Sequence, residues 1–228
     1  MNARDDARWA TAVVQQLSAL VCSVGFRQAP EERFPTPLQD ATDALIYLYE
    51  NSESLRVDRS RITLSGFSSG ANLAITVPLY AHHILNTRGL VKAIVSFYPV
   101  LDFFGYPKPK HQAVMEVKRM IPSGLISLQD DAFFFPGIDL KSPYLSPVFA
   151  EDKMLATLPQ PVIMYICELD ELREEAELFC QRLEKLGVAV QRRFLEGASH
   201  GFDKQLGQIT PFTKEVYADA IARLKKAL

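Results

Sequence analysis

Apolar positions along the chain follow two spacings, one typical of amphipathic helices and one typical of short buried strands. Trp9, Val13 and Leu17 recur at helical spacing, and a β-prone run follows directly at residues 19–24. Similar helical faces and short apolar runs then alternate to the C-terminus. The predicted helices after the first cover residues 38–48, 71–83, 173–186 and 212–224, and the predicted strands cover residues 19–24, 61–65, 91–97, 161–166 and 188–194.

This alternation of strands and helices predicts an α/β fold, with a mainly parallel sheet that carries helices on both faces. The pattern lapses between Pro99 and Pro161, where prolines and phenylalanines gather. We interpret residues 102–146 as a cap-like insertion over the sheet. No repeat or linker divides the chain, so a single domain over residues 1–228 is expected.

Composition and charge exclude several classes of protein. The 228 residues include 25 basic and 27 acidic side chains, and the net charge of −2 argues against binding to nucleic acid or to an anionic membrane. No membrane span or secretory segment is visible. The three cysteines and four histidines lack the spacing of a disulfide framework or a metal site, so we expect reduced core thiols, no metal and no cofactor. A cytoplasmic protein is the default expectation, and a homo-oligomer is left open.

A candidate nucleophile follows the predicted strand at residues 61–65. The sequence Gly-Phe-Ser-Ser-Gly leads from that strand into a helix, as the Gly-x-Ser-x-Gly nucleophile elbow requires. Gly66 and Gly70 are expected because the turn around Ser68 is too tight for flanking side chains. The backbone N–H of Ser69 then points where an oxyanion can be held. The five residues alone fit equally well a small-residue turn that feeds a helix.

A serine hydroxyl also needs a base and an acid, in the chain order serine, acid, histidine for this kind of elbow. Asp170 follows one predicted strand, and His200 follows the next strand along the chain. The carboxyl ends of parallel strands meet at one edge of a sheet, so both side chains are expected near Ser68. Glu168 and Glu171 lie beside Asp170 and offer the same chemistry.

Four sequence blocks occur in one order, and together they run from about residue 8 to residue 203. They are Phe26-Arg27-Gln28-Ala29-Pro30-Glu31, the elbow with its flanks at residues 58–74, Asp170-Glu171-Leu172-Arg173, and His200-Gly201-Phe202. In this order they resemble the hormone-sensitive-lipase-like carboxylesterases of the α/β-hydrolase fold. The resemblance implies that Ser68 is the nucleophile, His200 the general base and then acid, and Asp170 the group that fixes the histidine tautomer. It also implies that the Ser69 N–H is one oxyanion donor.

The resemblance implies a serine hydrolase that acts on a carboxylic ester, or a related lactone or amide, through an acyl-enzyme. Phe67, Phe103 and Phe104 are candidates for contact with a small apolar substrate, although ordinary packing of the cap explains such aromatics equally well. Substrate identity depends on the geometry of the cap and is left open. The alternative is a catalytically impaired α/β-hydrolase-like protein that binds an apolar small molecule.

The main departure from the family concerns its His-Gly-Gly-Gly motif, which supplies further oxyanion N–H groups. That motif should precede the helix around Trp9, and the sequence from Met1 does not contain it. We therefore expect the first strands of the family's sheet to be missing. This leaves a gap between residues 19–24 and 61–65, which then pair directly or expose a strand edge.

Overall fold

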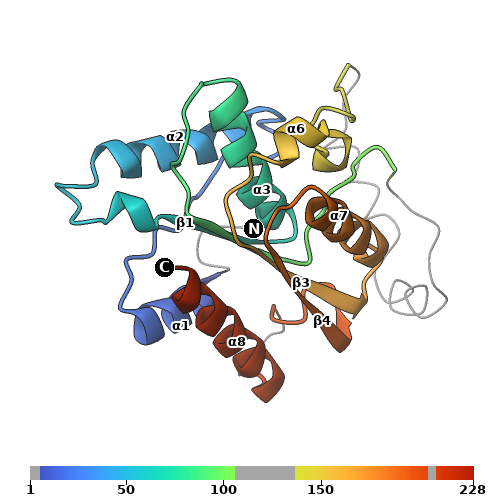
Figure 1. Ribbon diagram of the computed structural model, residues 1–228. Coiled ribbons are helices and arrows are strands. Elements are labelled where there is room, and N and C mark those ends of the chain that lie inside the picture. Colours follow the sequence, from blue (N-terminus) through green and yellow to red (C-terminus); the bar gives the residue numbers. More distant parts are fainter. Residues whose placement is uncertain (1–5, 106–136, 205–208) are drawn as a thin grey trace.

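A computed structural model describes residues 6–105, 137–204 and 209–228 of the chain (Figure 1). Most of the expected cap-like insertion, from residue 106 to residue 136, lies outside the described residues.

The centre of the molecule is a parallel sheet with the strand order β1-β2-β3-β4. Its strands are β1 (Thr63–Phe67), β2 (Ala93–Phe97), β3 (Val162–Leu169) and β4 (Val190–Ser199). Four of the five predicted strands are thereby confirmed. All three neighbouring pairs are parallel, so the carboxyl ends of the strands share one edge of the sheet.

Helices cover the sheet on both faces (Figure 1). The helices α1 and α8 lie on one face, and α3 and α7 lie on the other, while α2 packs against α3. The helical elements are α1 (Ala7–Leu17), α2 (Thr36–Glu50), α3 (Ser69–His83), α6 (Asp152–Leu155), α7 (Arg173–Lys185), α8 (Pro211–Ala227) and the short 3₁₀ turns at Arg59–Arg61 and Pro147–Phe149. The predicted α/β fold with a doubly covered parallel sheet is confirmed.

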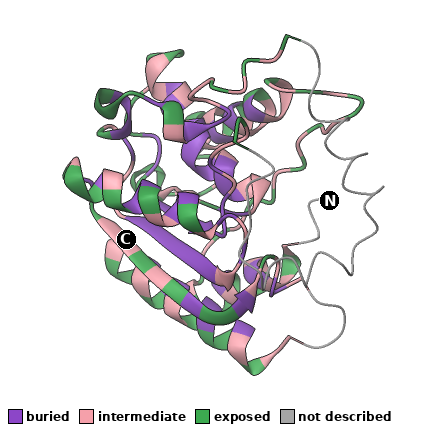
Figure 2. Ribbon diagram, turned by 90° about the vertical axis from the view of Figure 1, so that its right-hand side faces the viewer, coloured by how far each residue is buried: buried purple, intermediate pink, exposed green. Residues whose placement is uncertain are grey.

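Burial on both faces explains why the inner strands are continuous apolar runs instead of alternating ones. Every residue of β2 is buried, and so are the first six residues of β3. Figure 2 shows this buried layer between helices whose outer sides are exposed. The edge strand β4 alternates more, with buried Leu195 beside exposed Glu196.

The predicted strand at residues 19–24 is wrong. The helix α1 ends at Leu17, and Ser18 after it has a left-handed φ of 51°. The chain then continues without helix or strand as far as residue 28. Leu20 is 68% exposed, and Cys22 is exposed as well. A β-prone run becomes a strand only when a neighbouring strand supplies its hydrogen-bond partners.

The strand β1 is consequently an edge strand within the described part of the chain. Of the two outcomes expected for this edge, direct pairing with residues 19–24 does not occur. Ser65 on β1 is exposed, and its hydroxyl accepts a hydrogen bond of 2.9 Å from the indole N–H of Trp9. Helix α1 is thereby attached beside the open edge.

No helix among the described residues is long and apolar enough to cross a membrane.

Candidate active site

Ser68 lies in a sharp turn between β1 and α3, with φ of 53° and ψ of −117°. This conformation is strained for a residue other than glycine, and it lifts the side chain out of the regular strand and helix. A Cβ atom on Gly66 would overlap the carbonyl group of Gly70, so glycine is required at position 66. A Cβ atom on Gly70 would meet no atom within 4 Å. The steric reason expected for the second glycine is therefore wrong.

His200 connects the two other predicted triad residues. Its Nε2 lies 2.8 Å from Oγ of Ser68, and its Nδ1 lies 2.7 Å from Oδ2 of Asp170. With the proton on Nδ1, the imidazole donates to Asp170 and its Nε2 accepts from the Ser68 hydroxyl. Both distances are within the reach that proton transfer needs. The three residues converge at the carboxyl edge of the sheet, as their positions after β1, β3 and β4 predict.

Asp170 is the carboxylate that faces the imidazole, although Glu168 and Glu171 are its neighbours in sequence. It is 5% exposed, and its Oδ1 accepts a hydrogen bond of 3.0 Å from the backbone N–H of Leu172. Its two oxygens therefore have separate partners, which fixes the plane of the carboxylate. Glu168 instead accepts a hydrogen bond from the backbone N–H of Gly197 at 2.8 Å.

The N-terminus of α3 begins at Ser69, directly after the predicted nucleophile. Backbone N–H groups in the first turn of a helix have no acceptor within the helix, and they carry its positive dipole end. The N–H of Ser68 itself donates to the carbonyl of Phe97 at 3.0 Å. The N–H of Ser69, the first residue of α3, is thus the candidate oxyanion donor beside Ser68.

The three phenylalanines expected to contact substrate lie in different surroundings. Phe67 is 4% exposed and stacks on Phe97 with ring centroids 4.6 Å apart. It therefore belongs to the core, which corrects our expectation that it contacts substrate. As the last residue of β1, it points to the face that α1 and α8 cover. Phe103 is half-buried, while Phe104 is 54% exposed and meets Phe149 edge-on.

Two residues at the site carry no local sequence signal. The ring of Tyr98 meets the imidazole of His200 edge-on, with centroids 4.8 Å apart, and the Tyr98 hydroxyl donates to buried Asp203. Tyr98 directly follows β2 and Asp203 lies three residues after His200, and nothing else in the sequence indicates that either residue lies at the site.

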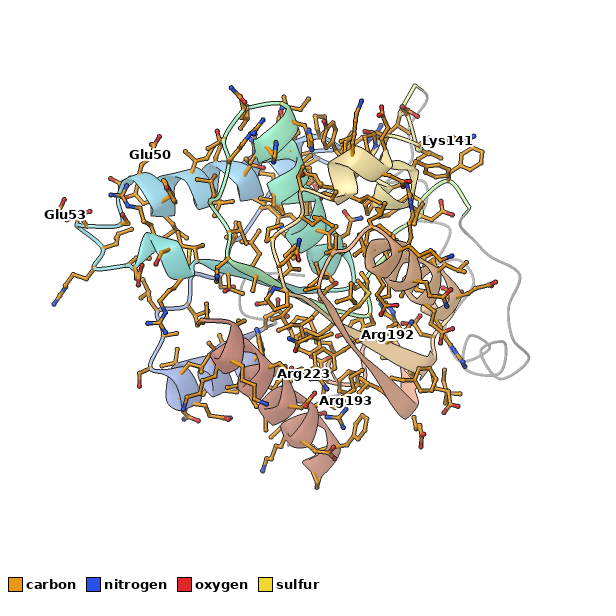
Figure 3. The ribbon with its side chains drawn as sticks, viewed as in Figure 1. Glu50, Glu53, Lys141, Arg192, Arg193 and Arg223 are labelled. Atoms are coloured by element: carbon orange, nitrogen blue, oxygen red, sulfur yellow. The ribbon has the colours of Figure 1, made fainter. Side chains whose placement is uncertain are left out.

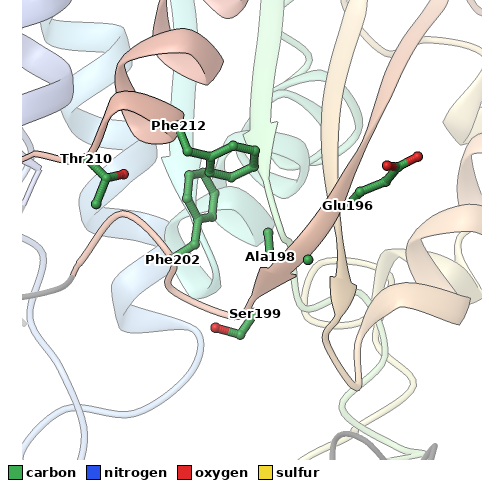
Figure 4. A pocket seen from close by; sticks show the side chains of 7 residues that line it. Glu196, Ala198, Ser199, Phe202, Thr210 and Phe212 are labelled. Carbon is green, nitrogen blue, oxygen red and sulfur yellow. The ribbon is translucent and has the colours of Figure 1, made fainter.

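A cavity of about 210 Å³ lies beside the end of β4 (Figure 4). Seven residues line it, namely Glu196, Gly197, Ala198, Ser199, Phe202, Thr210 and Phe212. It adjoins the loop that bears His200 but has no lining atom from Ser68 or Asp170, so it is separate from the predicted nucleophile. Within the described residues, no group of three histidine, cysteine or acidic side chains is arranged to hold a metal ion.

Comparison with known proteins agrees with this geometry. A family model described as the alpha/beta hydrolase fold matches residues 1–204. The ethyl acetate hydrolase of Pseudomonas putida is 29% identical, over all of this chain and 69% of its own length. The arylesterase of Saccharolobus solfataricus is 29% identical, over 80% of this chain and 57% of its own length.

The fold is also similar to that of a hyperthermophilic esterase from Pyrobaculum calidifontis. The TM-score is 0.86 and the identity 29%, and the match covers 99% of this chain and 72% of that esterase. The chain thus spans between about half and three quarters of the length of these relatives.

Proposed function

Because the chain belongs to the α/β-hydrolase-fold family, in its hormone-sensitive-lipase-like carboxylesterase branch, we propose that it hydrolyses a small apolar carboxylic ester through an acyl-enzyme on Ser68. One observation carries the proposal. The side chains of Ser68, His200 and Asp170 form a continuous hydrogen-bonded chain, with distances of 2.8 and 2.7 Å. A lactone or an activated amide would be attacked by the same chemistry.

In the first step, Nε2 of His200 takes the hydroxyl proton as Oγ of Ser68 attacks the carbonyl carbon of the ester. Asp170 holds the imidazole in the required tautomer and stabilises the imidazolium that forms. The carbonyl oxygen gains negative charge and accepts a hydrogen bond from the backbone N–H of Ser69 at the N-terminus of α3. When the tetrahedral intermediate collapses, His200 returns the proton to the departing alcohol.

In the second step, a water molecule attacks the acyl group on Ser68. His200 takes a proton from this water, and the released Oγ recovers it when the acid leaves. The side chain of His200 is 40% exposed, so solvent water reaches the imidazole.

The alternative is a catalytically impaired α/β-hydrolase-like protein that binds an apolar small molecule and hydrolyses esters only slowly. It rests on the number of oxyanion donors, of which the N–H of Ser69 at the N-terminus of α3 would be one. Loss of an oxyanion donor lowers kcat by about 10²- to 10³-fold in other serine hydrolases. A low kcat that still depends on Ser68 would fit an impaired enzyme.

The proposal is tested by hydrolysis of p-nitrophenyl acetate and p-nitrophenyl butyrate, with Ser68→Ala and Ser69→Ala compared with the unchanged protein. Only the side chain of Ser68 attacks, whereas alanine at position 69 keeps the backbone N–H. We expect Ser68→Ala to remove nearly all turnover and Ser69→Ala to retain it. Equal losses in two folded variants, or turnover that survives in Ser68→Ala, would overturn the proposal.

A further inference from the structure

A buried carboxylate lies three residues after His200. The side chain of Asp203 is 0% exposed, and both of its oxygens are hydrogen-bonded. Oδ1 accepts a short hydrogen bond from the hydroxyl of Tyr98, and Oδ2 accepts one of 2.7 Å from the hydroxyl of Tyr217. Nζ of Lys204 lies 3.1 Å from the same Oδ2. A carboxylate out of water requires such partners, so this arrangement is a built polar site within the core.

The groups around Asp203 come from several separate elements. Tyr98 follows β2, Tyr217 lies on α8, and Arg8 of α1 donates to the backbone carbonyl of Asp203 at 3.2 Å. Lys204 also forms an ion pair with Asp6, just before α1. The loop that bears His200 is therefore attached to the sheet and to both helices on that face.

Tyr98 connects this polar site to the imidazole. Tyr98 is 2% exposed, and its ring meets the ring of His200 edge-on with an interplanar angle of 62°. The backbone of Tyr98 has a φ of 38°, a strained value for a bulky residue, and its N–H donates to the carbonyl of Tyr165 at 2.8 Å. Strain of this kind persists only where the surroundings over-determine the conformation, and it is concentrated at functional sites.

We propose that Asp203 and Tyr98 are positioning residues for His200. The carboxylate fixes the tyrosine ring, and the ring keeps the imidazole turned with Nδ1 toward Asp170 and Nε2 toward Ser68. The effect on turnover rests on the proposed ester hydrolysis. The orientation of the imidazole, in contrast, is a property of the protein without substrate.

The two tyrosine hydroxyls that donate to Asp203 keep their protons at neutral pH. Burial, reinforced by the charge of Asp203, raises the pKa of both the Tyr98 and the Tyr217 hydroxyl well above the usual tyrosine value. The two hydroxyls therefore donate throughout the working pH range.

The chain offers a matched control on the same face of the sheet. The hydroxyl of buried Tyr165 donates to Asp219 at 2.7 Å. Arg193 on β4 and Arg223 on α8, both labelled in Figure 3, form ion pairs with the same carboxylate. Tyr165→Phe removes a buried tyrosine–carboxylate hydrogen bond, as Tyr98→Phe does. It leaves the rings of Tyr98 and His200 untouched.

The first readout is the tautomer of His200 in nitrogen NMR spectra, assigned with a His200→Ala variant at about pH 8, where a free imidazole is neutral. We expect one species protonated at Nδ1 in the unchanged protein and in Tyr165→Phe. Tyr98→Phe and Asp203→Asn should show mixed or broadened imidazole signals. A role in stability alone would lower the melting temperature of all three variants and leave this signature unchanged.

The second readout is the hydrolysis of p-nitrophenyl butyrate. Small misplacements of a catalytic group lower turnover by up to about 100-fold, so we expect kcat to fall by at least about fivefold in Tyr98→Phe. KM should stay nearly constant, because Asp203 and Tyr98 are both buried and only 2% exposed. Tyr165→Phe should keep both constants.

The outcomes separate this inference from the proposed function. A single Nδ1-protonated species and an unchanged kcat in Tyr98→Phe would overturn the positioning role, even with the esterase confirmed. A protein without turnover would contradict the proposed function, while the NMR comparison would still decide the positioning role. If Asp203→Asn does not fold, the comparison of Tyr98→Phe with Tyr165→Phe decides it.

Discussion

Gly66 and Gly70 approach so closely across the turn at Ser68 that a Cβ atom on Gly66 would overlap the Gly70 carbonyl group. The contact is one-sided, since a Cβ atom on Gly70 would have open space around it. The two glycines of the elbow therefore have different reasons for their presence. Only Gly66 sets the path of the turn that holds the strained Ser68.

Substituting alanine at each glycine should give opposite results. Gly66→Ala forces the turn apart, and overpacking of this kind lowers the free energy of unfolding by about 1–3 kcal/mol or more. Gly70→Ala lies in the first turn of α3, where alanine favours the helix by up to about 1 kcal/mol. Denaturant unfolding and p-nitrophenyl acetate turnover measure both effects. Equal destabilisation by the two substitutions would contradict the asymmetry.

Asp170→Asn should lower kcat by about 10³- to 10⁴-fold, because asparagine favours the wrong imidazole tautomer and cannot stabilise an imidazolium. Glu168→Gln is the matched control, since an amide oxygen can still accept the N–H of Gly197 that Glu168 binds. Turnover of p-nitrophenyl butyrate, with circular dichroism to check folding, compares them. A larger loss of kcat in Glu168→Gln than in Asp170→Asn would show that Asp170 is not the acid that serves His200.

The cysteines should differ strongly in reactivity. Cys22 is exposed, which corrects the expectation of a core thiol, whereas Cys167 and Cys180 are buried. Burial raises the pKa of both buried thiols, and the charge of Asp170 raises that of Cys167 further, so neither forms thiolate at neutral pH.

Iodoacetamide at about pH 8 should therefore modify Cys22 rapidly in the folded protein, and the two buried cysteines only after unfolding. Peptide mapping by mass spectrometry identifies the modified positions, and the same reaction in denaturant is the control. Rapid modification of Cys167 in the folded protein would show that the sheet beneath His200 is open to solvent.

Elements that depend on local pattern were predictable from the sequence, and elements that depend on a distant partner were not. The apolar runs predicted four strands, and the strand ends predicted where Ser68, Asp170 and His200 meet. The run at residues 19–24 has the same local character but has no strand beside it, so its pattern misled us. Tyr98 and Asp203 are 105 residues apart, and no local spacing indicates that they pair.

Phe67 illustrates a second limit, which concerns side-chain direction. Its place beside the nucleophile suggested contact with substrate, but successive residues of a strand point to opposite faces. The sheet therefore directs Phe67 toward Trp9 and Phe97 in the core, with the Trp9 ring 6.5 Å away.

The central claim, that His200 activates Ser68 as a nucleophile, is tested most directly by trapping with diethyl p-nitrophenyl phosphate. The reagent phosphorylates an activated serine, releases p-nitrophenol, and leaves an adduct that peptide mapping can locate. The account predicts one adduct, on Ser68, which also forms in Ser69→Ala and is lost in His200→Ala and Ser68→Ala. Adduct formation on another residue, or labelling of Ser68 at the same rate in folded His200→Ala, would contradict it.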